Sequence, residues 1–485
     1  MHPPPPTATL ASNTPPDPTT AAPPRARPAA SKQRPGTRAP GRRAPVGVRL
    51  IVAILSALAC AAAPAAAAPW SAPTTIPGAT GAPAIANGPS GPRALYWSSV
   101  VPPNPGGPRS FVSPLGPGLR PEPARPLPAA FQLGTVGGVS AVDGRGRIVL
   151  PALMRTRPNK GALAAGPLSA PRLRTLPAPV RATAVNAAGD AAVVIEPWAA
   201  RGYRPAAPRL VLRRHGHGFG RPLTLDRTGH GVGAAVAIDR RGRVLAAWDR
   251  DGRAYGRFVT AHGTLGAIQR LGPAGRNTAI QAVLSDDGRA AVAWTAQRVS
   301  EGYAASPFTA RLALATANRR FAPPTTLETV RETGFGRYVP APGVVVRLPA
   351  GRPGLAAWTG HDGQHWVVRA ASIHGTTLTA PQIVSEPGTD TVLGDAAAGP
   401  RGEAVVLLLP GCAPLCPAPS GPGAGLAAAT RAASAPAFGA PEPIVPAPAA
   451  ITGAQVAIQA ATGLAFATWA DDHASIGWSV RAPIH

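Results

Sequence analysis

The segment Ala237–Trp248, AIDRRGRVLAAW, decides the fold, because versions of it recur along the chain. It consists of an apolar strand, a turn that contains Gly242, a second apolar strand and a closing Trp. Clear copies begin at Ala84, Ala282 and Ala457, and in each the Trp falls six residues after the turn glycine. With the weaker copies, the turn glycines are Gly91, Gly146, Gly189, Gly242, Gly288, Gly354, Gly402 and Gly463.

The spacing of these glycines, 43 to 66 residues, is typical of the blades of a β-propeller. The strand after Gly242 is apolar on both faces, as expected for a strand buried between two layers. The Asp, Asn and Gly residues of the turns favour tight hairpins, because they tolerate a positive φ. A second, looser pair of strand candidates follows each copy, so each unit has the four strands of a blade.

The two ends of the repeated region complement each other. After Trp469 there is a single further strand candidate, around Ile476 to Val480. The missing phrase stands at the other end, where WSAPTTIP from Trp70 matches the last strand of other units, such as FGAPEPIV from Phe438. An N-terminal strand would therefore close the ring and cover its open edge. We predict an all-β propeller over residues 70–485 with eight four-stranded blades, or seven if one weak copy is an insertion.

The residues before the repeats differ in composition. Residues 1–45 are rich in Pro, Ala, Thr and Arg and contain almost no large apolar residues, so we expect a disordered leader. Residues 46–68 contain Arg49, an apolar run and then small residues, which is the order of a secretory signal peptide cleaved after Ala68. An uncleaved signal anchor, a lipid on Cys60 and a translation start at Val46 or Val48 are the alternatives. The protein is thus expected outside the cell, secreted or attached to the surface.

The formal net charge of +26 does not indicate nucleic-acid binding. Lys32 and Lys160 are the only lysines, and the arginines are scattered instead of forming a stripe with interleaved aromatic residues. This charge still allows binding to extracellular polysaccharides or anionic cell-wall polymers. We expect a monomer that contacts a membrane only through its signal anchor or a lipid.

Two cysteines, Cys412 and Cys416, would remain after signal cleavage. In an exported chain this spacing in a Pro-rich loop favours a local disulfide. A metal site would need further ligands, and neither a second Cys pair nor a nearby His supplies them. The sequence predicts no metal and no cofactor.

One rim of the ring is predicted to gather polar residues. If the strands of a blade are lettered A to D from the centre outward, the B-to-C loops and the D-to-A connections share this rim. Such a rim could hold a general acid/base pair or a cation, but Asp and Gly also simply form hairpin turns, which is the interpretation we favour. The candidate binding residues are Asp249, Asp251, Glu301, Tyr303, His361, Asp362, Asp471, Asp472 and His473.

The phrase SDDGRAAVAW from Ser285 resembles the Asp-box repeat of bacterial sialidase-type propellers, although its order and spacing of Ser, Asp and Gly differ. The blade plan is also similar to that of WD40-type propellers, with Trp248–Asp249 as one instance of their Trp-Asp signature. The resemblance covers residues 70–485 as architecture. The sialidase type implies a glycoside hydrolase with an arginine cluster and a Tyr/Glu pair, and Arg337–Pro340 matches its Arg-Ile-Pro phrase poorly.

Because no catalytic constellation recurs with the repeat, the sequence favours a binding or scaffold module for carbohydrate or an extracellular protein. A sialidase-like glycoside hydrolase is the alternative.

Overall fold

The computed structural model describes residues 69–81, 83–88, 90–99, 109–127, 141–153, 161–168, 171–196, 207–227, 233–275, 279–297, 308–330, 343–411, 425–446, 451–471 and 475–484. All of them belong to one compact unit, Pro64–His485. The Pro/Arg-rich leader, the signal segment, Cys60, Cys412 and Cys416 lie outside the described residues, so the expectations for them stay predictions.

The first four blades follow one another in the sequence. Blade 1 consists of β2 (Ala84–Gly88), β3 (Gly91–Ser99), β4 (Arg109–Pro114) and β5 (Arg125–Pro126). Blade 2 consists of β6 (Ala141–Val142), β7 (Arg147–Leu153), β8 (Gly161–Pro167) and β9 (Arg172–Leu176). Blade 3 consists of β10 (Val180–Val185), β11 (Ala191–Ile195), β12 (Arg209–Arg213) and β13 (Leu223–Thr224). Blade 4 consists of β14 (Ala234–Ile238), β15 (Val244–Arg250), β16 (Arg253–Val259) and β17 (Leu265–Pro273).

The other four blades complete the ring. Blade 5 consists of β18 (Ile280–Leu284), β19 (Ala290–Gln297), β20 (Phe308–Ala315) and β21 (Thr325–Val330). Blade 6 consists of β22 (Val344–Arg347), β23 (Gly354–His361), β24 (Trp366–His374), β25 (Thr377–Leu378) and β26 (Gln382–Ile383). Blade 7 consists of β27 (Thr391–Ala398), β28 (Ala404–Pro410), β29 (Leu426–Arg431) and β30 (Glu442–Val445). Blade 8 consists of β31 (Ile451–Ile458), β32 (Ala465–Asp471), β33 (Ser475–Arg481) and β1 (Thr74–Thr80).

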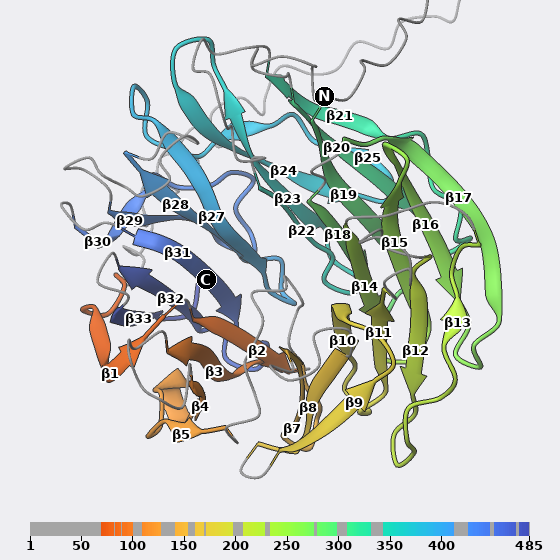
Figure 1. Cartoon of the computed structure of the whole chain (residues 1–485). Helices are drawn as coiled ribbons and strands as arrows, with labels where there is room; N and C mark the ends of the chain where they lie inside the picture. The colour runs from red at the N-terminus through yellow and green to blue at the C-terminus, as the bar shows by residue number, and fades with distance from the viewer. Residues whose placement is uncertain are drawn as a thin grey trace, which may run out of the picture. The chain divides into compact units, whose positions relative to one another are not determined.

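The structure confirms the eight-bladed, all-β propeller and its closure by an N-terminal strand. Within each blade the neighbouring strands are antiparallel, and β1 forms the outer strand of blade 8 by pairing with β33. Trp70 extends this pairing through a bridge to Arg481. Figure 1 shows the blades following one another in chain order until β1 meets β33. The sole helical element of the described residues is the short 3₁₀ turn η1 (Pro117–Leu119).

The turn glycines behave as predicted in seven blades, and blade 6 requires a correction. Gly242 and its counterparts have a positive φ, which only glycine adopts without strain. In blade 6, however, Gly354 begins β23, and the turn residue with a positive φ is Gly351, at +67°. The turn PAGRPG contains both glycines, and the strand spacing alone does not tell which one takes the left-handed conformation.

The hydrophobic core is divided into eight layers, one at each junction between neighbouring blades. Each cluster of buried residues in the described chain combines side chains of two adjacent blades. Each repeat Trp that the structure describes packs into the layer shared with the preceding blade, namely Trp97, Trp248, Trp294, Trp358 and Trp469. Trp248 thus joins the residues of blade 3, and Trp294 those of blade 4. This confirms that the repeated Trp is a packing residue.

Hydrogen bonds between the A-to-B turns of neighbouring blades form a second connection, which we call the turn belt. The bonds join Ala460 N to Ser90 O, Gly144 N to Ala187 O, Asn186 Nδ2 to Asp239 O, Arg240 N to Asp286 Oδ1, Gly351 N to Asp287 Oδ2 and Arg401 Nη2 to Thr462 O. Blades 1 and 2 are instead linked by the parallel pair β2 and β6, and blades 6 and 7 by the ion pair of Arg347 and Asp395. The belt holds one rim of the ring together through backbone and turn side chains.

The innermost strands leave one edge unpaired, and side chains of the preceding blade bond to it. Gln281 accepts a hydrogen bond from Val346 N at 2.8 Å, and Gln455 accepts one from Ile85 N at the same distance. Asp395 accepts one from Val456 N at 3.1 Å. These bonds satisfy backbone groups that a closed sheet would pair. No helix in the part of the chain that the structure describes is both long and apolar enough to span a membrane.

Candidate functional site

The structure describes five of the nine candidate residues of the predicted rim. Glu301, Tyr303, Asp472 and His473 lie outside the described ranges. In blade 4, Asp249 lies near the end of β15 and Asp251 follows the strand. In blade 6, His361 ends β23 and Asp362 follows it, and in blade 8 Asp471 ends β32. The ring therefore distributes the described candidates over three separate blades, with one pair that is close in sequence in blade 4 and one in blade 6.

Several rim carboxylates bond to the backbone of their own blade. Asp249 is buried and accepts a hydrogen bond from Gly233 N, just before β14. Asp471 accepts one from Ser475 N at 2.7 Å, across the loop that it opens. Asp251 occupies a turn with φ +48°, and its side chain is 67% exposed. These contacts are those of turn-forming residues.

Blade 6 gathers polar and aromatic groups into what we call the blade 6 rim cluster, namely His361, Asp362, His365, Trp366 and Asp390. The His361 ring meets the Trp366 ring edge-on, with centroids 5.2 Å apart. Asp390 Oδ1 accepts a hydrogen bond from Trp366 N at 2.8 Å and lies 3.6 Å from His365 Nδ1. The cluster joins the B-to-C loop of blade 6 to the connection that leads into blade 7.

The loop of this cluster is closed by its own side chains. Asp362 Oδ1 accepts hydrogen bonds from Gln364 N and His365 N, and His361 Nδ1 accepts one from Gly363 N. The backbone N–H groups of His365 and Gln364 lower the pKa of Asp362, so that its exposed carboxylate is charged near neutral pH. The loop thus presents one negative charge beside two partly exposed imidazole rings.

A neighbouring blade supports the cluster. Arg369 in β24 donates a hydrogen bond from Nη2 to His361 O at 3.4 Å, and its Nε lies 3.3 Å from Glu328 Oε2 in β21. The cluster therefore combines donors and acceptors on one supported loop, beside the buried ring of Trp366. Such a surface suits a ligand rich in hydroxyl groups better than it suits proton transfer, because the carboxylate at its tip has a lowered pKa.

Sequence reasoning missed a charged pair within the ring. Asp395 in β27 lies 3.0 Å from Arg347 in β22, across the junction of blades 6 and 7. Burial raises the pKa of Asp395, although Arg347 and the N–H of Val456 act in the opposite direction. The signal was present, because Gln281, Asp395 and Gln455 interrupt otherwise apolar inner strands seven or eight residues before the turn glycine.

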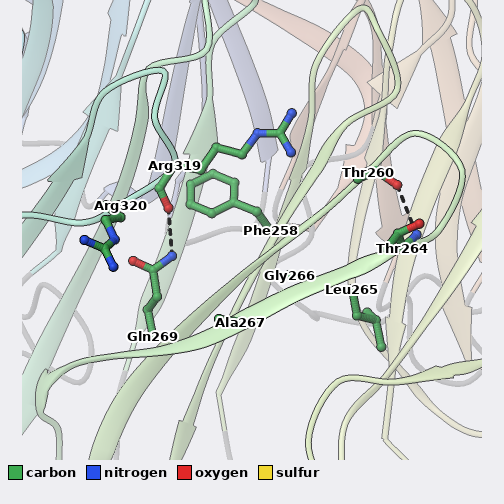
Figure 2. Close-up of a pocket in the computed structure, with 9 residues that line it drawn as sticks. All are labelled: Phe258, Thr260, Thr264, Leu265, Gly266, Ala267, Gln269, Arg319 and Arg320. Carbon is green, nitrogen blue, oxygen red and sulfur yellow. Dashed lines mark hydrogen bonds between the residues drawn. The ribbon is translucent and has the colours of Figure 1, made fainter.

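Sequence reasoning also missed a pocket of about 320 Å³ between blades 4 and 5, which we call the inter-blade pocket (Figure 2). One side is formed by β16, β17 and the turn between them, and the other by the turn that connects β20 to β21. The pocket is lined by Phe258, Thr260, Thr264, Leu265, Gly266, Ala267, Gln269, Arg319 and Arg320. Within the described residues, no group of three or more His, Cys, Asp and Glu is arranged to hold a metal.

Comparisons with known proteins give no family. No family model matches the chain, and no curated protein matches it. Among solved structures it is similar to a polysaccharide lyase, an ulvan lyase, with 11% identity, a TM-score of 0.39 and coverage of 70% of this chain and 93% of the lyase.

Two further structures are similar at the same level. A post-proline cleaving enzyme from Rickettsia typhi has 9% identity and a TM-score of 0.39, with coverage of 78% of this chain and 56% of the enzyme. A puromycin hydrolase has 15% identity and a TM-score of 0.41, with coverage of 83% and 53%. Identities and scores this low carry no information about the activity or ligands of this protein.

Proposed function

We propose that the propeller is a binding module that uses the blade 6 rim to hold a carbohydrate outside the cell. The observation that carries this proposal is the cluster itself, where His361, Asp362 and His365 offer exposed polar groups that backbone bonds keep in place. Fixed donors and acceptors next to an aromatic ring are the usual means of holding a hydroxylated ligand. A surface site for an extracellular protein would use the same groups.

A sialidase-like hydrolase is the second candidate, and the described rim does not favour it. Its chemistry needs a carboxyl group that donates a proton near neutral pH. The exposed carboxylate of the cluster, Asp362, has a lowered pKa instead. Burial raises the pKa of Asp395, but this carboxyl group is already bonded to Arg347 and Val456 N inside the ring.

The test is a glycan and cell-wall polymer array probed with the purified propeller. The double variant H361A/H365A removes both imidazoles of the rim and should weaken the strongest array signal by about tenfold. The matched control H217A/H374A removes two exposed imidazoles from the opposite rim, away from any other candidate site, and should leave the signal unchanged. Equal losses in both variants would contradict a rim site. Hydrolysis of chromogenic glycosides by the wild-type protein would contradict a function limited to binding and would support the glycoside hydrolase instead.

Export is part of this proposal and has its own measurement. The order of basic, apolar and small residues up to Ala68 supports cleavage before Pro69. Mass spectrometry of protein recovered from culture medium should find an N-terminus at Pro69 and a mass lower by two hydrogens for a Cys412–Cys416 disulfide. A protein that stays in the membrane fraction with its leader attached would show the signal anchor instead.

A further inference from the structure

The inter-blade pocket carries two positive charges that no residue described by the structure neutralises. Arg319 and Arg320 occupy the turn between β20 and β21 and line the pocket together. Arg319 is half-buried and Arg320 is exposed. Neither guanidinium group has an ion-pair partner within the described ranges, whereas Arg243, Arg250 and Arg289 each bind a carboxylate. The pocket is therefore a place where an anion would be attracted.

The backbone of Arg319 adopts a left-handed conformation, which is unfavourable for an arginine. The corresponding turn of blade 4, TAHGT, aligns with TANRR in blade 5, so that Arg319 takes the place of Gly263. Both turns are closed by the same bond, from Gly263 N to Thr260 O and from Arg319 N to Thr316 O. Both residues are left-handed, with φ +84° for Gly263 and +59° for Arg319. Strain of this kind at a residue other than glycine is concentrated at functional sites.

The two arginines also have a rigid base. The side chain of Gln269 in β17 donates to Arg319 O at 2.8 Å and accepts from Phe321 N at 3.0 Å (Figure 2 shows the first bond). Arg320 N donates to Asn318 Oδ1 at 3.0 Å. These bonds fix the turn against the neighbouring blade before any ligand arrives. Binding then has to order only the arginine side chains.

The opposite wall of the pocket offers hydroxyl groups and a small apolar surface. Thr260 Oγ1 accepts from Thr264 N at 3.0 Å, which leaves its own proton free to donate. The Thr264 side chain is exposed. On the β17 side the pocket is lined by the small residues Gly266 and Ala267. Phe258 contributes an aromatic ring, which is stacked on the ring of Phe321. Hydroxyl donors, an apolar surface and a pair of guanidinium groups together match a sugar ring with an acidic substituent.

We propose that the inter-blade pocket binds a sugar residue that carries a carboxylate or a sulfate group, within a longer acidic polysaccharide. A volume of about 320 Å³ suits one or two sugar rings of such a chain. The pocket borders the C-to-D turns, on the rim opposite the blade 6 rim cluster. The proposal therefore goes beyond the rim site and does not depend on it.

The experiment is calorimetric titration of the propeller at an ionic strength of about 0.15 M, where long-range attraction to the net positive charge is screened. The probes are a galacturonic acid hexamer, a sulfated carrageenan hexamer and neutral maltohexaose. We expect at least one acidic probe to bind while the neutral one does not. The double variant R319G/R320Q should weaken this binding by about tenfold or more, since charge-assisted bonds are lost.

The matched control is R240Q/R241Q. It removes two adjacent, exposed arginines from the A-to-B turn of blade 4, where Arg240 and Arg241 use their backbone N–H groups for bonding. The control should bind the acidic probe as the wild type does. Equal weakening in both double variants would mean a general effect of charge and would overturn the proposal. Equal binding of a glutamate hexapeptide, or of maltohexaose, would overturn it as well.

A stability measurement separates ligand binding from a structural role of Arg319. The single variant R319G places glycine at a left-handed residue, so its melting temperature should stay at or above that of the wild type. Its affinity for the acidic probe should still fall. A clear drop in melting temperature would show that Arg319 serves the fold, and would overturn the proposal.

Discussion

At the scale of single residues, two physical factors require glycine in the repeated turn: a positive φ and the close approach of a neighbouring blade. Their relative importance differs from blade to blade. Gly91 and Gly146 occupy the same place in blades 1 and 2, and both have a positive φ. A Cβ added to Gly91 would lie 2.6 Å from the Cα of Gln459 in blade 8. A Cβ added to Gly146 would meet no atom within 4 Å. One glycine is thus required by backbone conformation alone, and the other also by the close approach of a neighbouring blade.

This comparison gives the first prediction, for G91A and G146A. The G146A change should lower the free energy of unfolding by about 1 kcal/mol, the cost of a left-handed conformation for alanine. The G91A change should cost about 1–3 kcal/mol more, because the new methyl group meets backbone that a side-chain rotation cannot move away. Urea unfolding followed by tryptophan fluorescence measures both values. Equal losses would contradict the role assigned to the junction of blades 8 and 1.

The same scale shows why the fold was easier to predict than the site. Trp248 and Gly242 recur because every blade needs the same packing and the same turn, so the repeat itself reveals them. An arginine at the position of Arg319 is not repeated in the other blades that the structure describes. It can be recognised as unusual only when the turn of blade 5 is compared with that of blade 4 and its contact with Gln269 is known. A site formed where two blades meet leaves no period in the sequence.

At the scale of elements, the turn belt explains why the A-to-B turns are rich in Asp. Asp287 follows β18 and receives hydrogen bonds from Arg289 in its own turn and from Gly351 N in blade 6. Burial acts to raise its pKa, but the bonds from Arg289 and Gly351 dominate and lower it from 3.8 to about 2. The charged carboxylate therefore stabilises the contact between blades 5 and 6.

The second prediction concerns the pH dependence of this contact. Because the folded pKa of Asp287 lies below its unfolded value, its contribution is complete above pH 3.8 and is lost as the pH falls towards 2. D287N should lower the free energy of unfolding at neutral pH and should show a shallower decline than the wild type in the acid range. Urea titrations from about pH 5 to pH 2 provide the curves. Parallel curves below pH 4 would contradict the assignment.

Elements were predicted well where their pattern is repeated and less well where it is local. The closing strand was identified from a phrase shared with other blades, and it pairs as expected with β33. The sequence assigns the turn of blade 6 to Gly354 instead of Gly351, because two glycines flank Arg352 and Pro353 and neither lies six residues before Trp358. The rim carboxylates could be named from the sequence, but their bonds to Gly233 N and Ser475 N could not.

At the scale of the whole molecule, closure of the ring depends on one strand from the N-terminal end. Ile76 and Ala79 of β1 join the layer between blades 8 and 1, and Trp70 joins the layer between blades 7 and 8. Ser71 N also donates to Val480 O at 2.8 Å. A short segment thus contributes to two adjacent core layers and covers the edge of β33.

The third prediction tests this closure with two shortened chains. A chain that starts at Pro69 keeps all of these contacts and should unfold at the urea concentration measured for the longer protein. A chain that starts at Gly81 lacks β1 and Trp70, exposes apolar side chains and leaves an open strand edge, so it should unfold earlier and associate. Urea midpoints and size-exclusion chromatography distinguish the two. Equal midpoints would show that the ring holds without β1.

Because β1 pairs with β33, the ring can close only after the last blade of the propeller has been synthesised. Blades 1 to 7 are each built from consecutive strands, so a growing chain can form them in the order of synthesis. Blade 8 is different, because β1 is synthesised before blade 1 and can pair only after β33 has been made. The two strands are separated in sequence by almost the whole propeller. A prematurely terminated chain would keep β1 without a partner, as an extended, accessible segment of the kind that proteases cut. Pairing with β33 therefore protects β1 from cleavage only once the eighth blade has been completed.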